Sequence, residues 1–249
     1  MSLNSAAPGL LSLWDRAQNT KPGKQALLLV QQCGLSLQDA EELRVGDRDA
    51  KLLRLRALLF GGEADATARC PECGDVAALT IRPADLILPE VQDPATDHIS
   101  GNHVFGDYVF TFRPPTAGDA AALAAARNVE AAELMLLRRC VTDVKRERET
   151  IPPQDYQLLP ADLVDFISRK MEEADPQAVI GFDLTCPACE TRWTEMFDIA
   201  SFLWTEISRE AMRLFREVDE LAIRYGWAES AILDMHPARR RMYLEMTRD

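Results

Sequence analysis

The sequence predicts an α+β fold that is mainly helical and contains a small, split β element. Two copies of a Cys-Pro-x-Cys motif, Cys70–Cys73 and Cys186–Cys189, lie more than a hundred residues apart, and each leads into a strand-like run. Apolar residues at helical spacing fill most of the remaining chain. We therefore predict a zinc-ribbon-like element made of two cysteine turns, here called knuckles, with a helical insertion between them and helices at the C-terminus.

The two knuckles divide the chain into five predicted segments. A length of 249 residues with 47% hydrophobic content allows either one large core or two modest ones. The segments are residues 1–63, an N-terminal arm with helices; 64–113, the first knuckle with strands and a hairpin; 114–175, the helical insertion; 176–198, the second knuckle hairpin; and 199–249, the C-terminal helical region.

The N-terminal segment is predicted to hold an irregular arm and three helices. Prolines and asparagines between short apolar runs at the start of the chain favour an arm with about one helical turn around Leu10–Trp14. Helical patterns follow at residues 24–33 and 36–43. Gly46-Asp47 indicates a stop and an N-cap for a third helix, which ends before Gly61.

Strand signals accompany the first knuckle and recur further along the chain. Val76–Ile81 reads as a strand, and Val104–Phe110 predicts a hairpin because a Gly-Asp pair separates two aromatic and β-branched arms. Residues 89–102, with two prolines and a glycine, predict a surface loop between them. His98 and His103 are expected to be exposed there.

The insertion and the second knuckle combine helices with a further hairpin. Residues 116–144 predict an alanine-rich helix with a break near Asn128, and the charged run that follows reads as a solvated helix end. Another helix follows Pro160, with apolar residues on one face. Residues 179–185 and 192–198 predict two short strands joined by the second cysteine turn.

The C-terminal region is predicted to be one long helix followed by two short ones. Asp198 is placed to cap the long helix, whose apolar stripe runs from Leu203 to Tyr225 before Gly226 ends it. That stripe suits either a coiled-coil partner or the protein's own core, and the core is the commoner outcome. Arg239–Arg241 could contact an acidic partner or complement a helix dipole.

The four motif cysteines predict a single structural zinc site. Two thiolates from each turn complete a tetrahedral, closed site, and paired motifs sharing the same proline are more specific than a lone Cys-x-x-Cys. The alternative is four unmetallated thiols in turns. The remaining cysteines, Cys33 and Cys140, lie in apolar helical settings and are predicted to be small core residues. The predicted Zn²⁺ ligands are Cys70, Cys73, Cys186 and Cys189.

Composition and missing motifs argue against several functions. A net charge of −12 makes binding to nucleic acid backbones unfavourable, and the apolar run Ala26–Val30 is too short for a membrane segment, so we expect a protein that is cytoplasmic when made. A zinc nucleobase deaminase needs His-x-Glu and Pro-Cys-x-x-Cys, and the sequence contains neither. It also lacks the zincin, Walker, Rossmann and Gly-x-Ser-x-Gly signatures, which argues against an enzyme.

Three scattered stretches resemble one known family, the baseplate proteins of contractile bacteriophage tails and of related contractile injection systems. The resemblance covers most of the chain from Gly46 onward, although residues 89–112 match nothing in it. The stretches are Gly46-Asp47-Arg48-Asp49 leading to Phe60-Gly61; the two knuckles, the second followed by Trp193; and the ending, Tyr225–Leu233 with Arg239–Leu244.

The resemblance implies a non-enzymatic component that forms or assembles the baseplate or its hub. Its partners would be other baseplate, hub, spike or tube proteins, in a phage tail or injection particle. Two alternatives stay open. One is an assembly chaperone that is absent from the mature particle, and the other is a zinc-ribbon module that binds a protein in regulation.

Overall fold

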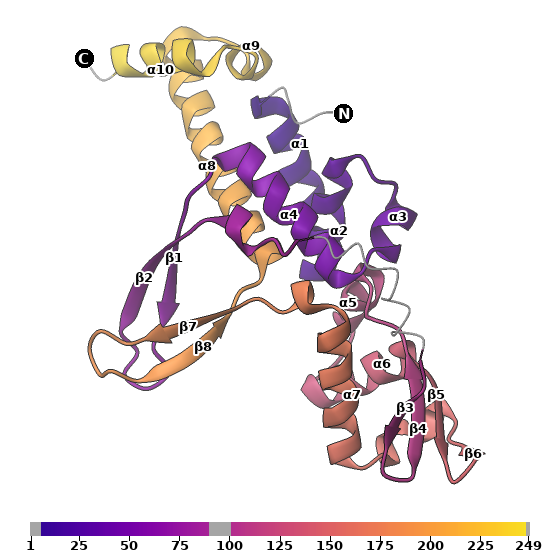
Figure 1. The fold of residues 1–249 in the computed structure, drawn as a ribbon. Helices are drawn as coiled ribbons and strands as arrows, with labels where there is room; N and C mark the ends of the chain where they lie inside the picture. The colour runs from indigo at the N-terminus through magenta and orange to yellow at the C-terminus, as the bar shows by residue number, and fades with distance from the viewer. Residues whose placement is uncertain (1–5, 90–100, 248–249) are drawn as a thin grey trace.

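The computed structural model describes residues 6–89 and 101–247, which form a mixed α/β and mainly helical chain (Figure 1). Its helices are α1 (Ala6–Ala17), α2 (Pro22–Val30), α3 (Leu37–Glu42), α4 (Val45–Phe60), α5 (Ala117–Leu123), α6 (Val129–Cys140), α7 (Ala161–Ala174), α8 (Ile199–Tyr225), α9 (Glu229–Leu233) and α10 (Pro237–Met246). Its strands are β1 (Ala64–Arg69), β2 (Val76–Ile81), β3 (His103–Phe105), β4 (Tyr108–Phe112), β5 (Val141–Arg146), β6 (Glu149–Thr150), β7 (Gly181–Thr185) and β8 (Arg192–Met196).

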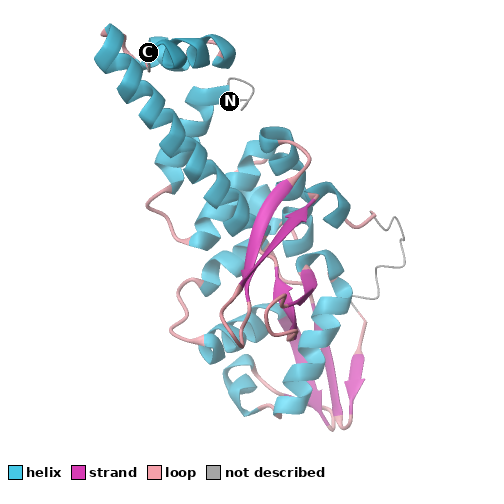
Figure 2. Cartoon of the chain, turned by 90° about the vertical axis from the view of Figure 1, so that its left-hand side faces the viewer, coloured by secondary structure: helices cyan, strands magenta, loops and turns pink. Residues whose placement is uncertain are grey.

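The strands of the described chain form three separate antiparallel sheets. Strands β1 and β2 pair as one two-stranded ribbon, β7 and β8 as another, and β3-β4-β5-β6 form a four-stranded sheet. The two ribbons extend to one side of the helices, and Figure 2, which looks onto that side, shows no described helix in front of them. The predicted α+β class is therefore confirmed, with the knuckle strands in ribbons that project from the helical body.

The main core lies between α8 and the N-terminal helices. Leu13 of α1, Leu29 of α2 and Leu52 of α4 are fully buried against α8 residues such as Leu203 and Ile207. Burying these large side chains supplies the main stabilising free energy of this half of the chain. The predicted irregular arm is wrong, because α1 is a regular helix whose leucines belong to this core.

An ion pair inside this core fixes the orientation of α4 against α8. The guanidinium of Arg56, 2% exposed, donates to both carboxylate oxygens of Glu206, at 2.9 Å and 2.7 Å. It also donates to the carbonyl of Gly61, the residue that follows α4, at 2.8 Å. A bidentate pair of this kind adds directional specificity to the packing of the apolar residues.

Helix α8 packs against the protein's own core, the outcome that the sequence pattern favoured over a coiled-coil partner. Asp198 accepts hydrogen bonds from the backbone of Ala200 and Ser201, and Gly226 ends the helix in the left-handed conformation. The chain then folds back so that α9 and α10 cover the end of α8. Arg240 from the arginine triplet is buried there and donates to Glu217 at 2.8 Å, so it has a structural role.

A second core is shared by α6, α7 and the four-stranded sheet. This sheet joins β5 and β6 of the predicted helical insertion to the β3-β4 hairpin, which belongs to the predicted first knuckle segment, so the insertion as the structure has it includes that hairpin and is not purely helical. The buried residues of this core include Phe110 from β4, Val144 from β5 and Ile167 from α7. His103 stacks on Phe110 and Phe112, with ring centroids 5.3 Å and 5.0 Å away, so the prediction of an exposed histidine is wrong. His98 and most of the predicted loop 89–102 lie outside the described residues.

The predicted helix over residues 116–144 is two helices and a strand. Thr116 and Asn128 cap α5 and α6, so the predicted break near Asn128 is confirmed. The helix ends at Cys140 because Val141 and Val144 are buried on β5, which pairs with β4. Within the charged run that follows, Glu147 and Arg148 have positive φ and form the turn between β5 and β6. The prediction of a helix end there is therefore wrong.

The segment that follows the insertion is joined to the segment that precedes it, in addition to the packing of α5 against α2 and α3. The side chain of Gln177 donates to the Leu86 carbonyl at 3.2 Å and accepts from the Leu88 amide at 2.7 Å. Asp175 accepts a hydrogen bond of 2.9 Å from the backbone of Gly46 in the first turn of α4. Gly46-Asp47 is therefore not the predicted N-cap, since α4 starts at Val45. The carboxylate of Asp175, from a distant segment, satisfies the buried Gly46 amide, which has no partner within the helix.

We predict that Gly46→Ala destabilises the protein. A Cβ at this position would lie 2.1 Å from Asp175 Oδ1 and 2.8 Å from Gln177 Cβ, so the docked segment would have to move and its hydrogen bond to α4 would be lost. Alanine gains about 1 kcal/mol of helix propensity, but overpacking and the broken bond outweigh it, and we expect a net loss of about 2 kcal/mol. Urea unfolding measures the change.

The control is Gly62→Ala, where an added Cβ has nothing within 4 Å. Equal stability of the Gly46→Ala and Gly62→Ala variants would contradict the close approach of Asp175 to α4.

A buried carboxylate joins three elements at the base of the insertion. Asp119 is 1% exposed, and its oxygens lie 2.5 Å from Arg113 Nη1 and 2.7 Å from Arg139 Nε. Burial alone would raise the pKa of Asp119, but hydrogen bonds from Arg113, the Thr116 amide and Arg139 together hold it well below the usual range. Asp119 thus links the end of β4, the start of α5 and the end of α6.

We predict that the contribution of Asp119 to stability is lost in acid. A carboxyl whose pKa is lowered by folding stabilises the native state above its unfolded value of 3.8, and this stabilisation disappears as pH falls through the folded value. Asp119→Asn should therefore cost about 3 kcal/mol near neutral pH and progressively less below about pH 4. Urea unfolding across this range measures it, with the exposed Asp107→Asn as control. A cost that does not change with pH would contradict the assignment.

Candidate metal centre

Two β ribbons carry the predicted knuckles to one point. Arg69 pairs with Val76 at the end of the first ribbon, and Thr185 pairs with Arg192 at the end of the second. Each ribbon thus ends in a turn that contains its two cysteines. Strand β1, which completes the first ribbon, is absent from the sequence prediction, although Ala-Asp-Ala-Thr-Ala-Arg alternates small and polar residues with the period of a strand.

The two knuckles have the same backbone structure. The Cys70 amide donates to the Asp75 carbonyl at 2.8 Å, and the Cys186 amide donates to the Thr191 carbonyl at 2.9 Å. Within each turn, the amide of the residue after the second cysteine donates to the carbonyl of the first cysteine at 3.0 Å. The repeated motif in the sequence therefore corresponds to a repeated local structure, with both cysteines of each turn on its inner side.

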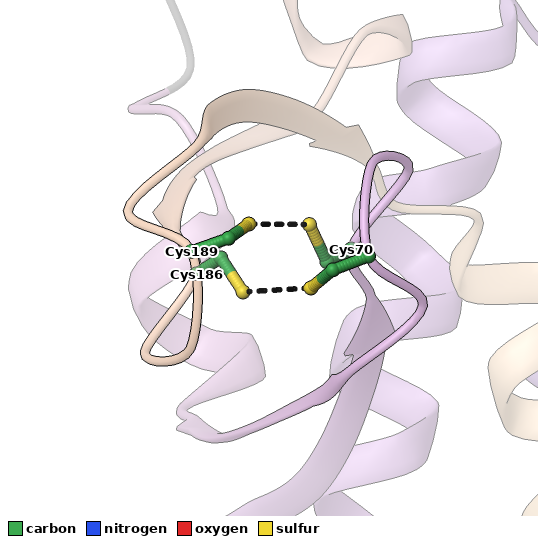
Figure 3. Close-up of side chains that lie close together, drawn as sticks. Cys70, Cys186 and Cys189 are labelled. Carbon is green, nitrogen blue, oxygen red and sulfur yellow. Dashed lines mark hydrogen bonds between the residues drawn. The ribbon is translucent and has the colours of Figure 1, made fainter.

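The structure brings together the four cysteines that the sequence singled out. Their sulfur atoms all lie within 4.8 Å of one another, with Cys70 and Cys189 at 3.6 Å and Cys73 and Cys186 at 3.5 Å. Figure 3 shows the sulfurs of the two facing turns pointing toward each other. A tetrahedral zinc with Zn–S bonds of about 2.3 Å has sulfur–sulfur edges of about 3.8 Å. The four-cysteine cluster therefore has the size and composition of a zinc thiolate site.

Burial differs between the first and second cysteine of each turn. Cys70 and Cys186 are buried between the ribbons, whereas Cys73 and Cys189 reach the surface. Among the described residues this is the one group of histidine, cysteine or acidic side chains arranged to hold a metal ion. With four thiolates as ligands, an ion there would have no open coordination position.

The close approach of the sulfurs couples their ionisation. Hydrogen bonds with the Thr191 hydroxyl and amide, and with Cys73, lower the pKa of Cys189 to about 6. The Asp75 amide acts to lower the pKa of Cys73, but hydrogen bonds with Cys189, Cys186 and Cys70 together raise it to about 12. Thr191 is a neighbour of the site that the sequence prediction did not include.

The two cysteines outside the motifs differ in their surroundings. Cys140 is fully buried in the core of the insertion, as predicted. Cys33 is exposed after the end of α2, so the prediction that it is a core residue is wrong. The short 3-10 turn that ends this helix places the side chain outside the apolar face, and Cys33 is available as a control for experiments on the cluster.

A family model described as T4 bacteriophage base plate protein matches residues 16–204, more than half of the chain. The chain belongs to this baseplate family. The baseplate resemblance inferred from the sequence is thus confirmed, and the match includes both knuckles and the insertion between them. It ends within α8, so the whole C-terminal stretch that contributed to the resemblance lies beyond it.

No curated protein and no solved structure gives a significant match to this baseplate protein. Within residues 6–89 and 101–247, none of the helices combines the length and apolar character that crossing a membrane requires.

The two knuckles share a left-handed backbone position but carry different residue types there, and this difference gives a prediction. The residue after the second cysteine is left-handed in both turns, with φ of +76° at Gly74 and +59° at Glu190. A side chain in this conformation costs about 1 kcal/mol, which glycine avoids. We expect Glu190→Gly to stabilise the protein by about 0.5–1 kcal/mol and Gly74→Ala to destabilise it by about 1 kcal/mol.

Thermal unfolding of the two variants, each with the wild-type metal content verified, measures these changes. Shifts of the same sign would show that the two turns are not equivalent in conformation.

Proposed function

We propose that this protein is a non-enzymatic structural or assembly component of a contractile tail or injection-system baseplate, stabilised by one structural zinc ion. The family match supports the baseplate role. The observation that carries the zinc proposal is the meeting of sulfurs 113 and 119 residues apart in the sequence within one four-cysteine cluster. The proposed ligands are Cys70, Cys73, Cys186 and Cys189.

The proposed role of the zinc is to close the two ribbons against each other. Each ribbon has only two strands. The residues of the second ribbon alternate between exposed and half-buried positions, and in the first ribbon only Ala64, Ala68 and Ile81 are buried. Two-stranded ribbons of this kind have marginal stability alone, so a metal bond at their tips is the strongest available link. A closed thiolate site supplies that link without offering a position for a substrate, which supports a scaffold over an enzyme.

The proposed partners are other baseplate, hub, spike or tube proteins. A net charge of −12 opposes binding to nucleic acid, which also counts against a regulator that binds nucleic acid. An assembly chaperone that leaves before the particle is complete remains the second candidate, and a protein-binding zinc-ribbon module is the third. Membership of a baseplate family favours the first two.

We predict one zinc ion per chain, lost equally when either knuckle is changed. Cys70→Ser and Cys186→Ser each remove one of four ligands, and an incomplete tetrahedral site holds zinc far more weakly. Elemental analysis of the purified variants should therefore find little zinc in both, together with a lowered melting temperature. Cys33→Ser, at an exposed cysteine outside the cluster, should retain the full metal content.

Zinc content that falls by half in each knuckle variant would mean two independent sites and would overturn the shared cluster. A chain that contains no zinc after expression in zinc-supplemented medium would overturn the metal proposal altogether.

The baseplate role is tested in purified particles. A structural component should be present at a fixed ratio to the sheath and tube proteins, and deletion of its gene should leave misassembled tails. Absence from intact particles, with the same assembly defect, would instead establish the chaperone. Normal particles from the deletion strain would exclude both roles.

A further inference from the structure

Helix α8 has a face that the described chain leaves uncovered. Its buried residues, among them Leu203, Ile207 and Leu214, lie on one stripe that packs against α1, α2 and α4. Thr205, Arg209, Met212 and Arg216 each lie two positions from a residue of this stripe and are rotated from it by about 200°, which places them on the opposite side of the helix. In Figure 1 that side of α8 faces away from the N-terminal helices. Trp204 lies at the edge of the stripe and packs in part against the core.

The uncovered face combines a hollow, apolar side chains and unpaired cations. Six residues of α8 line a shallow hollow of ≈ 540 Å³: Trp204, Thr205, Ser208, Arg209, Met212 and Arg216. Met212 is 38% exposed at its centre, and Ile223, 79% exposed, continues the same stripe three turns further along. We call the six lining residues the α8 surface.

The arginines of the α8 surface differ from the other arginine nearby. Arg213, on the side of the helix, is held by Glu210 and Glu217, and Arg240 shares Glu217. Arg209 and Arg216 make no ion pair with any residue in the described part of the chain. Two free guanidinium groups therefore flank an exposed apolar side chain in a protein whose net charge is −12.

We propose that the α8 surface binds an acidic amphipathic helix of a partner protein. An apolar side chain of that helix would enter the hollow between Trp204 and Met212, and its carboxylates would pair with Arg209 and Arg216. Laying an amphipathic helix on such a face is a common mode of peptide recognition. Aromatic, methionine and arginine side chains are also the types most enriched in interfaces between proteins.

Charge disfavours a second copy of this chain as the occupant. In an antiparallel pair of α8 helices crossing at Met212, Arg209 of one copy would lie opposite Arg216 of the other. In a parallel pair, each arginine would face its own equivalent. Both symmetric arrangements bring arginines close together, which disfavours self-association even though the exposed Asp219 lies one turn from Arg216.

This inference deepens the proposed function, since it specifies the chemistry of one baseplate partner, but its first test does not depend on that function. The probe is a fluorescein-labelled helical peptide of three heptads, with leucine at positions a and d and glutamate at e and g. A matched peptide carries lysine in place of glutamate. Fluorescence anisotropy with the full-length protein at low salt measures the affinity of each.

We expect the glutamate peptide to bind, and Arg209→Glu with Arg216→Glu to weaken that binding by about tenfold or more. The same double variant should gain affinity for the lysine peptide. The control, Arg239→Glu with Arg241→Glu, makes the same charge change at exposed positions of α10 and should bind the glutamate peptide as the wild type does. Unchanged melting temperatures would show that both variants are folded.

Three results would overturn the proposal: equal binding of both peptides by the wild type, equal losses in the α8 and α10 variants, or tighter binding of a single-stranded oligonucleotide than of the glutamate peptide. Particle analysis then separates the two proposals. Incorporation of the α8 double variant at the wild-type level would refute partner binding at the α8 surface and leave the baseplate role standing. Normal particles without the protein would refute the baseplate role itself.

Discussion

The structure depends on one constraint: two short β ribbons from distant parts of the sequence must meet at their tips. The sulfurs that lie closest together belong to residues 113 and 119 positions apart. Because the ribbon tips meet, the chain between them must leave the helical body and return to nearly the same point. The junction of Gln177 with Leu86 and Leu88, and of Asp175 with α4, is where that return is made. The four-cysteine cluster and this junction therefore act as two separate ties on the same pair of ribbons.

These ties explain how a protein of this family offers several separate surfaces at once. The helical core around α8, the insertion with its own core and the projecting ribbons are each held by different interactions. In the proposed baseplate role, this arrangement leaves each part able to contact a different neighbour without disturbing the others. The described helices leave both the α8 surface and the ribbons uncovered.

The sequence predicted the parts of the fold that local chemistry determines. Capping residues such as Thr116 and Asp198 and the left-handed Gly226 set helix ends from within a few residues, and the repeated cysteine motif marked both knuckles. The failures arise where distant contacts decide. The first turn of α4 is satisfied by Asp175, β5 forms because β4 lies beside it, and α1 is ordered by packing against α8. No local pattern at Gly46, Val141 or Leu13 records these partners, and His103 is half-buried for the same reason.

The double hydrogen bond made by Gln177 has a consequence for the evolution of this chain. Because Gln177 holds the chain before the insertion to the chain after it, the length of the surface turns inside the insertion has little effect on the rest of the fold, whereas α5 must keep its contacts with α2 and α3. Lineages are then free to lengthen or shorten those turns while the cysteine-bearing frame stays unaltered. Length differences among related chains should accordingly concentrate there.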